Sequence, residues 1–498
     1  SRSRASPQPG APPGSPPPPA RAPGGLRPWQ PPRPRAFRLR ASRRPPSRPR
    51  RRRSPPRAGS SRAAAPIGVR GGVAHFRVPP ASHGRLVLVV SALGNSQHGY
   101  PVSFRLSEPP RHLARAVSPP RLVIQPYRPP EHVRAQLESL VIPVGDSRHI
   151  PGPPRIFDVP LLNGRPLCSG GSMRVRARWA AAGARCVVYL DQAAGSDPGH
   201  VELAEAIVRL LESHIIPAGD RLVGPAADVD GDRRLAILLT PLLQHLQNGR
   251  TSVGGFVRAD DFRPQLQPPR SNRSDMIYLN TSLAPGQALA DVLSHEYRHV
   301  LAFSHRDALG HASEEDWLNE AIAHLAEPGP TNIKHRIQAY LAEPSRFPLV
   351  VPDYFRAGLW RCDGVRGSTF LFLDWCRQQH GEQLVRGMLT SGRTGIDNLV
   401  AVTGTPFPRL FRSWSLAMIC GDRPLGESGP APAILRWNVG EPLEIQVAGT
   451  ATCYVAPQDL PAGAMVRIEA PAGARLQVTV ALRGATEPSP RPNTSDAP

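Results

Sequence analysis

The stretch at residues 294–305, SHEYRHVLAFSH, has two histidines four positions apart, His295 and His299, with Glu296 directly after the first. On a helix, side chains at i and i+4 lie on one face, so both imidazoles can bind the same metal ion. Zinc takes such nitrogen ligands at about 2.0–2.1 Å. Glu296 would lie beside the metal and act as general base toward an attacking water. The stretch therefore predicts a hydrolytic zinc site.

Two residues compete for the role of third ligand, and the first is His305. It follows His299 by six residues, as in the metzincin pattern HExxHxxGxxH. That pattern needs a glycine, which breaks the helix, where this chain has Ala302. We expect the helix to continue instead. At about 100° per residue, His305 would then point to the far side of the helix.

The second candidate is Glu320, in the segment SEEDWLNEAIAHLAEPG. Ser313 and Asp316 have the spacing of a capping box, which predicts a helix over 313–327. The distance in sequence from His299 leaves room for a loop and a returning helix. The alternative is that Glu320 is a surface carboxylate on an amphipathic helix. The HExxH motif, the spacing and the Asn-Glu pair together favour Glu320 as the third zinc ligand.

The pair HEYRH and WLNEAIAHLAE resembles the gluzincin metallopeptidases. With DVDGDRRLAILLT, SDMIYLNTS and GSTFLFLDWCRQQHGEQLVRGML, the chain is similar to the hyicolysin-type neutral metalloproteases over residues 184–420. The resemblance implies a secreted or cell-surface zinc endopeptidase with a helical lower lobe, which acts on a protein or peptide substrate. It also implies that His295, His299 and Glu320 bind one zinc ion and that Glu296 is the general base.

The chain departs from the gluzincin pattern in two places. One turn after the ligand glutamate, where thermolysin has an acid, this chain has His324. Glu327 is then the candidate for orienting a ligand imidazole, and His324 is a further candidate for supporting the ligands or the oxyanion. Gluzincins stabilise the oxyanion with a tyrosine or histidine, but Arg366 stands at the matching place. Tyr354, Arg366 and His380 are the candidates for that role.

Two weaker patterns lie upstream. Asp228, Asp230 and Asp232 alternate in DVDGD, which suggests a Ca²⁺ site built from carboxylates. The glycine and the acid of an EF-hand are replaced by Arg233 and Leu239, so the alternative is an Asx-rich turn before a strand. The segment SDMIYLN is either an edge strand that pairs with an extended substrate or an ordinary core strand.

The pattern along the chain predicts an α+β protein: a zincin-like catalytic domain, made of a small sheet and a helical lobe, flanked by β-rich modules and a disordered N-terminal tail. The expected parts are a disordered tail (1–62), a small β-rich module (63–107), an irregular linker region (108–183), the metallopeptidase domain (184–425), a β-sandwich-like module (426–485) and a second disordered tail (486–498).

The net charge of +22 is concentrated in the first part of the chain. Residues 1–62 hold 17 arginines, 18 prolines and no acid, so the remainder carries 61 − 17 = 44 basic against 39 acidic residues. Such a tail attracts polyanions, but a solvated tail without a specific nucleic-acid partner is the simpler interpretation. No apolar run approaches the length of a membrane span, and no signal peptide is visible.

Six cysteines without CxxC spacing argue against a structural zinc finger, and Cys168–Cys186 or Cys362–Cys376 are the local disulfide options.

Three functions are compatible with these patterns. The first is a zinc endopeptidase with Glu320 as third ligand, and the second is a metzincin-type protease with His305 in that place. The third is a zinc-binding surface or adhesion protein without catalytic activity. Glu296 argues against the third, because a purely structural zinc site has no use for a base.

Overall fold

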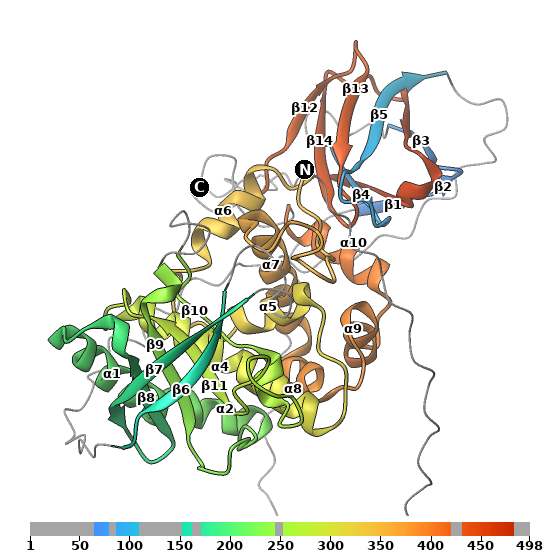
Figure 1. Ribbon diagram of the computed structural model, residues 1–498. Helices are drawn as coiled ribbons and strands as arrows, with labels where there is room; N and C mark the ends of the chain where they lie inside the picture. Colours follow the sequence, from blue (N-terminus) through green and yellow to red (C-terminus); the bar gives the residue numbers. More distant parts are fainter. Residues whose placement is uncertain are drawn as a thin grey trace, which may run out of the picture. The chain divides into compact units, whose positions relative to one another are not determined.

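The computed structural model describes residues 64–78, 86–108, 152–161, 171–244, 252–419 and 431–482 (Figure 1). This part of the chain contains both helices and sheets, so the predicted α+β class is confirmed. The tails predicted at 1–62 and 486–498 lie outside it. None of the helices in these ranges is long and apolar enough to cross a membrane.

A six-stranded mixed sheet has the strand order β10-β11-β9-β8-β7-β6. Its strands are β6 (Arg155–Pro160), β7 (Ser172–Ala182), β8 (Cys186–Asp191), β9 (Leu235–Thr240), β10 (Gly255–Phe256) and β11 (Met276–Asn280). Strands β8, β9 and β11 are parallel, and β10, β7 and β6 pair antiparallel to their neighbours. The central strands are apolar up to their last residues because both faces of the sheet are buried: Ile237 lies in one core and Leu238 in another.

Strands β6 and β7 correct the prediction of an irregular linker over 108–183, because both belong to this sheet. In the sequence SMRVRARWAAA of β7, arginines alternate with apolar residues at the period of a strand. Val175 and Ala177 are buried, whereas Arg174 and Arg176 are exposed. The proline- and arginine-rich surroundings concealed this signal.

Helix α4 (Gln287–Ala308) carries the HExxH motif and packs on one face of the sheet, as do α1 (Pro198–Leu210), a π-helical turn (Leu211–Ile215) and α2 (Ile216–Val223). Leu289, Leu293 and Val300 of α4 recur at helical spacing and are buried against the sheet. On another face of α4, Ala302 belongs to the core of the helical lobe. Helix α4 therefore joins the two cores.

The helical lobe consists of α5 (Asp316–His324), α6 (Lys334–Ala342), α7 (Asp363–His380), α8 (Gln383–Thr390), α9 (Gly395–Thr403) and α10 (Phe407–Ala417). Large aromatic side chains fill its core, among them Trp317, Phe372 and Trp414. The second predicted helix is shorter than expected. It starts at Asp316, whose carboxylate accepts a hydrogen bond from the backbone of Tyr354 (2.8 Å), so the Ser313–Asp316 capping box does not form.

A buried ion pair fastens the C-terminal end of α4 to the lobe. Arg306 lies 3.5 Å from Glu314 and also donates to the backbone carbonyls of Ala312, Met388 and Arg393. Both charged side chains are almost fully buried, at 2% and 3% exposure. Hydrogen bonds to buried carbonyls offset the desolvation of the guanidinium, so this pair is a fixed part of the fold.

The remaining strands form a β-sandwich of two five-stranded sheets, ordered β1-β16-β4-β14-β12 and β13-β5-β15-β3-β2. The strands are β1 (Ala64–Ile67), β2 (Val69–Arg70), β3 (Val73–Arg77), β4 (Leu86–Ala92), β5 (Tyr100–Ser107), β12 (Leu435–Asn438), β13 (Leu443–Val447), β14 (Thr452–Gln458), β15 (Met465–Glu469) and β16 (Leu476–Leu482). Strands from 63–107 and from 426–485 alternate within both sheets. The two predicted β modules are thus corrected to one sandwich, because β1, β4 and β5 pair only with strands of the other range.

The described cysteines Cys186, Cys362, Cys376 and Cys453 are all free thiols. Cys362 caps the start of α7 and Cys376 lies near its end, so about 21 Å of helix separates them. That excludes the local disulfide between them. Cys168, the other suggested partner of Cys186, lies outside the described residues.

Candidate metal centre

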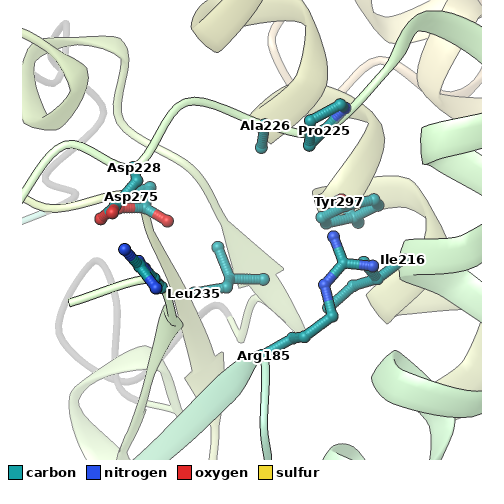
Figure 2. Close-up of a pocket in the computed structure, with 9 residues that line it drawn as sticks. Arg185, Ile216, Pro225, Ala226, Asp228, Leu235, Asp275 and Tyr297 are labelled. Atoms are coloured by element: carbon teal, nitrogen blue, oxygen red, sulfur yellow. The ribbon is translucent and has the colours of Figure 1, made fainter. Parts of the chain in front are cut away.

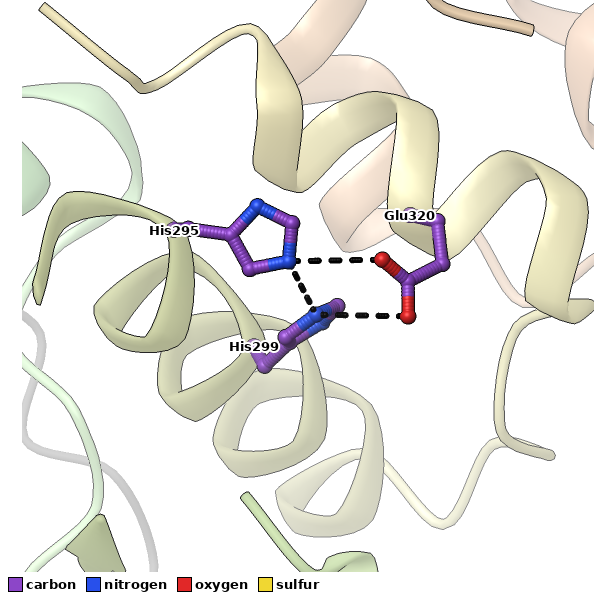
Figure 3. Close-up of side chains that lie close together, drawn as sticks. All are labelled: His295, His299 and Glu320. Carbon is purple, nitrogen blue, oxygen red and sulfur yellow. Dashed lines mark hydrogen bonds and ion pairs between the residues drawn. The ribbon is translucent and has the colours of Figure 1, made fainter. Parts of the chain in front are cut away.

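His295 and His299 of α4 converge with Glu320 of α5 (Figure 3). The two Nε2 atoms lie 3.2 Å apart. One carboxylate oxygen of Glu320 is 3.3 Å from Nε2 of His295, and the other is 4.0 Å from Nε2 of His299. The structure thus brings together the three residues that the sequence suggested as ligands, from two separate helices.

These donor atoms fit a zinc ion. Ligands at 2.0–2.1 Å from a tetrahedral ion lie about 3.3 Å from one another, close to the observed separations. The donor set of two imidazoles and one carboxylate is the one that catalytic zinc sites use, with a fourth position left for water or substrate. His295 and His299 are also buried, at 6% and 7% exposure. Two imidazole nitrogens that face each other in a buried place are well suited to share a cation.

Glu296 lies on α4 next to His295, and its carboxylate is buried with Oε2 lacking a hydrogen-bond partner. Burial raises the pKa of Glu296 to about 7, although the charge on His295 opposes the shift. A carboxylate with a pKa near neutral can both accept and return a proton at physiological pH. Glu296 therefore has the properties of a general base.

Strand β10 makes close contact with Glu296. A Cβ atom at Gly255 would lie 3.1 Å from Cγ of Glu296 and 2.8 Å from Cδ2 of Leu279, so only glycine allows this approach. Strand β10 is the edge of the six-stranded sheet, and β11 lies inside it, between β10 and β9. The suggestion that SDMIYLN is an edge strand is therefore wrong, and the edge beside Glu296 is formed by β10.

Glu327 follows α5 and accepts hydrogen bonds through one oxygen, Oε1, from Nδ1 of His295 (2.8 Å) and Nδ1 of His324 (2.5 Å). Burial opposes its ionisation, but His324 and His295 lower the pKa of Glu327 to about 2. Nε2 of His324 is 2.7 Å from Nη1 of Arg336 on α6. Glu327 thus contacts the ligand His295, as the sequence suggested, and Arg336 is a neighbour that the sequence did not indicate.

Arg366 pairs with Glu320 through its two terminal nitrogens, Nη1 and Nη2, which lie 3.1 Å from Oε2 and Oε1 of the carboxylate. It also donates to the carbonyl of Trp360 (3.2 Å). Burial opposes the charge on Glu320, but Arg366 and His295 hold the pKa of Glu320 well below its usual range. Arg366 therefore keeps Glu320 ionised and fixes the orientation of its carboxylate.

The other two oxyanion candidates differ in position. Tyr354 is buried, and burial raises the pKa of its phenol. The phenol also interacts electrostatically with the charges of Arg366 and Glu320. His380 lies at the C-terminal end of α7, about 21 Å along the helix from Arg366. His380 is therefore too far away for a role at this centre.

His305 does not join the metal centre. Helix α4 continues past Ala302 to Ala308, as expected in the absence of a glycine. Nε2 of His305 lies 3.4 Å from the backbone oxygen of Gly224, at the end of α2. That places it on the side of α4 that faces α2.

The cluster of carboxylates upstream of α4 differs from the predicted one by one residue, because Asp275 takes the place of Asp232. Asp228 and Asp230 come together with Asp275, whereas Asp232 accepts from the backbone of Arg234 (2.7 Å). Burial raises the pKa of Asp275 to about 7.

A cavity of about 250 Å³ adjoins this group. Figure 2 shows Asp228 and Asp275 on one side of the cavity and Arg185 beside Tyr297 on the other.

Neither the protein-family models nor the curated proteins contain a match to this chain.

Proposed function

We propose that this protein is a zinc-dependent endopeptidase of gluzincin type, with a zincin-like domain formed by the six-stranded sheet and the helical lobe. The observation that carries the proposal is the convergence of His295, His299 and Glu320 next to the buried carboxylate of Glu296. A purely structural zinc site closes its coordination with a fourth protein ligand and needs no base. The described residues of the chain offer three ligands and a base, which is the composition of a hydrolytic site.

Each residue has a distinct part in the proposed reaction. His295, His299 and Glu320 hold the zinc ion, which when bound would polarise a peptide carbonyl and acidify a water molecule. Glu296 accepts the proton of the attacking water and delivers it to the amine that leaves. Arg366 and Tyr354 are the candidates for stabilising negative charge on the substrate. Arg366 already pairs with Glu320, so Tyr354 has the freer side chain for this role.

The two alternative functions have less support. A metzincin-type site requires His305 at the metal, but its imidazole contacts Gly224 instead. A zinc-binding adhesion protein would not need Glu296 buried without a partner for Oε2. Secretion or display at the cell surface and a protein or peptide substrate are part of the proposal, and both follow from the resemblance to gluzincins.

Replacing Glu296 with glutamine tests the proposal. Glu296→Gln keeps the size of the side chain and removes the base, so casein cleavage should fall by a factor of about 100 or more while zinc content stays unchanged. Glu343→Gln, at an exposed position after α6, is the matched control and should keep full activity. Cleavage that survives Glu296→Gln would show that another group is the base.

A further inference from the structure

Four residues form a continuous hydrogen-bonded row that ends at the metal centre. Arg336 of α6 contacts His324 (2.7 Å), His324 contacts Glu327 (2.5 Å), and Glu327 contacts His295 (2.8 Å). His324 and Glu327 each have only 1% of the side chain exposed, and His295 has 8%. The row therefore excludes water and connects α6 to a residue of α4 through the turn that follows α5.

The donor and acceptor properties of arginine set the tautomer of His324. A guanidinium has donors only, so Nε2 of His324 must accept from Arg336. A neutral imidazole carries its single proton on the other nitrogen, so Nδ1 of His324 donates to Glu327.

This tautomer decides between two overlapping groups of potential ligands. His295, His324 and Glu327 lie close enough together to hold a metal ion, as do His295, His299 and Glu320. In the first group, however, Arg336 occupies Nε2 of His324, so the nitrogen that faces the others must carry the proton and has no lone pair for a metal. In the second group, Nδ1 of His295 donates to Glu327, and none of the described arginines occupies Nε2, which can bind a metal once its own proton is displaced.

We propose that Arg336 and His324 are positioning residues for the metal centre. By donating to Oε1, His324 holds the Glu327 carboxylate where it accepts the Nδ1 proton of His295. Nδ1 of His295 thus keeps its proton, and Nε2 is the atom presented to the metal. Carboxylates commonly orient histidine ligands; here the carboxylate is itself oriented by a histidine, and that histidine by an arginine. The inference rests on the proposed zinc site but not on proteolysis.

Paired substitutions in the full chain test this proposal, with the zinc dissociation constant measured by chelator competition. Arg336→Met removes the donor to His324, whereas Arg336→Lys keeps a cationic donor. His324→Gln removes the donor at the Nδ1 position, whereas His324→Asn places an amide nitrogen there. Arg356→Met, which alters an arginine that is 87% exposed, is the control.

We expect Arg336→Met and His324→Gln to weaken zinc binding by about 10- to 100-fold, and the lysine and asparagine variants by less than about tenfold. The unfolding midpoint of each metal-free variant separates positioning from general packing. If Arg336→Met and His324→Gln lower that midpoint but leave the zinc affinity unchanged, the two residues only support the fold and the proposal is wrong. Complete loss of zinc in His324→Asn would make His324 a ligand and would also overturn it. An unaltered protein that binds no zinc would instead refute the proposed function itself.

Discussion

Zinc binding should release a proton from His295 near neutral pH. Burial lowers the pKa of His295, but its hydrogen bonds with Glu320 and Glu327 outweigh that effect and raise the pKa to about 10 in the metal-free protein. Burial lowers the pKa of His299 to about 4, and Glu320 is ionised. Of the three proposed ligands, only His295 therefore carries a proton that zinc must displace at pH 7.

The number of protons displaced sets how steeply the zinc affinity depends on pH. With one proton displaced, the zinc affinity should rise about tenfold per pH unit, or about 100-fold between pH 6 and pH 8. Chelator competition at several pH values measures the slope, and calorimetry in buffers with different heats of ionisation counts the released protons. His305→Ala should show the same slope, because His305 contacts Gly224 and not the metal centre. An affinity that stays constant from pH 6 to pH 8 would refute the assigned charge of His295.

Three further predictions concern other parts of the structure. Glu320→Ala should reduce bound zinc to background while His305→Ala keeps one zinc per chain, as measured by metal analysis; the reverse pattern would favour the metzincin alternative. Arg306→Met removes the cation beside the buried Glu314, which among the described residues keeps hydrogen bonds only from Glu315, Gly395 and Asn398, and it leaves three buried carbonyls without their arginine donor. Denaturant unfolding should therefore show a loss of about 3–5 kcal/mol, and no loss would mean that the pair is dispensable. Burial raises the pKa of Asp275 from 3.8 to about 7, so its contribution to stability is present at low pH and lost as the pH rises through 7. The unfolding free energy of Asp275→Asn, relative to that of the unaltered protein, should therefore be higher at pH 8 than at pH 5. The same relative value at pH 5 and pH 8 would contradict the raised pKa of Asp275.

The group of candidate ligands could be predicted from the sequence because the relevant geometry is local. The i, i+4 spacing of His295 and His299 determines their common face once α4 is helical. Ala302 likewise indicated that α4 would continue and carry His305 away, which the structure confirms. Glu320 required only that a second helix return to the first.

Glu327 was suggested by the sequence, but two other contacts around these residues could not be predicted in this way. Arg336 reaches His324 because α6 packs inside the helical lobe, and no spacing in the sequence relates Arg336 to His295. Gly255 matters because β10 passes close to Glu296, although 41 positions separate them in the sequence. Tertiary packing of distant segments creates both contacts.

The strands themselves could be predicted from local sequence, but their pairing partners could not. The apolar runs of β4 and β14 predict strands, but not that they pair with each other although residues 93–451 separate them in the sequence. For that reason the sequence suggested two β modules where the structure has one sandwich. In β7, by contrast, the signal was present in RVRARWA and was obscured by its arginines.

The identity of the atoms that bind zinc in the purified protein decides whether the proposed metal centre exists. X-ray absorption at the zinc edge, or anomalous diffraction from crystals, identifies the atoms that bind the metal. We expect one zinc with two imidazole nitrogens and one carboxylate oxygen from protein at about 2.0–2.1 Å, supplied by His295, His299 and Glu320. Zinc held instead by His324 and Glu327, or absence of bound zinc, would contradict this expectation.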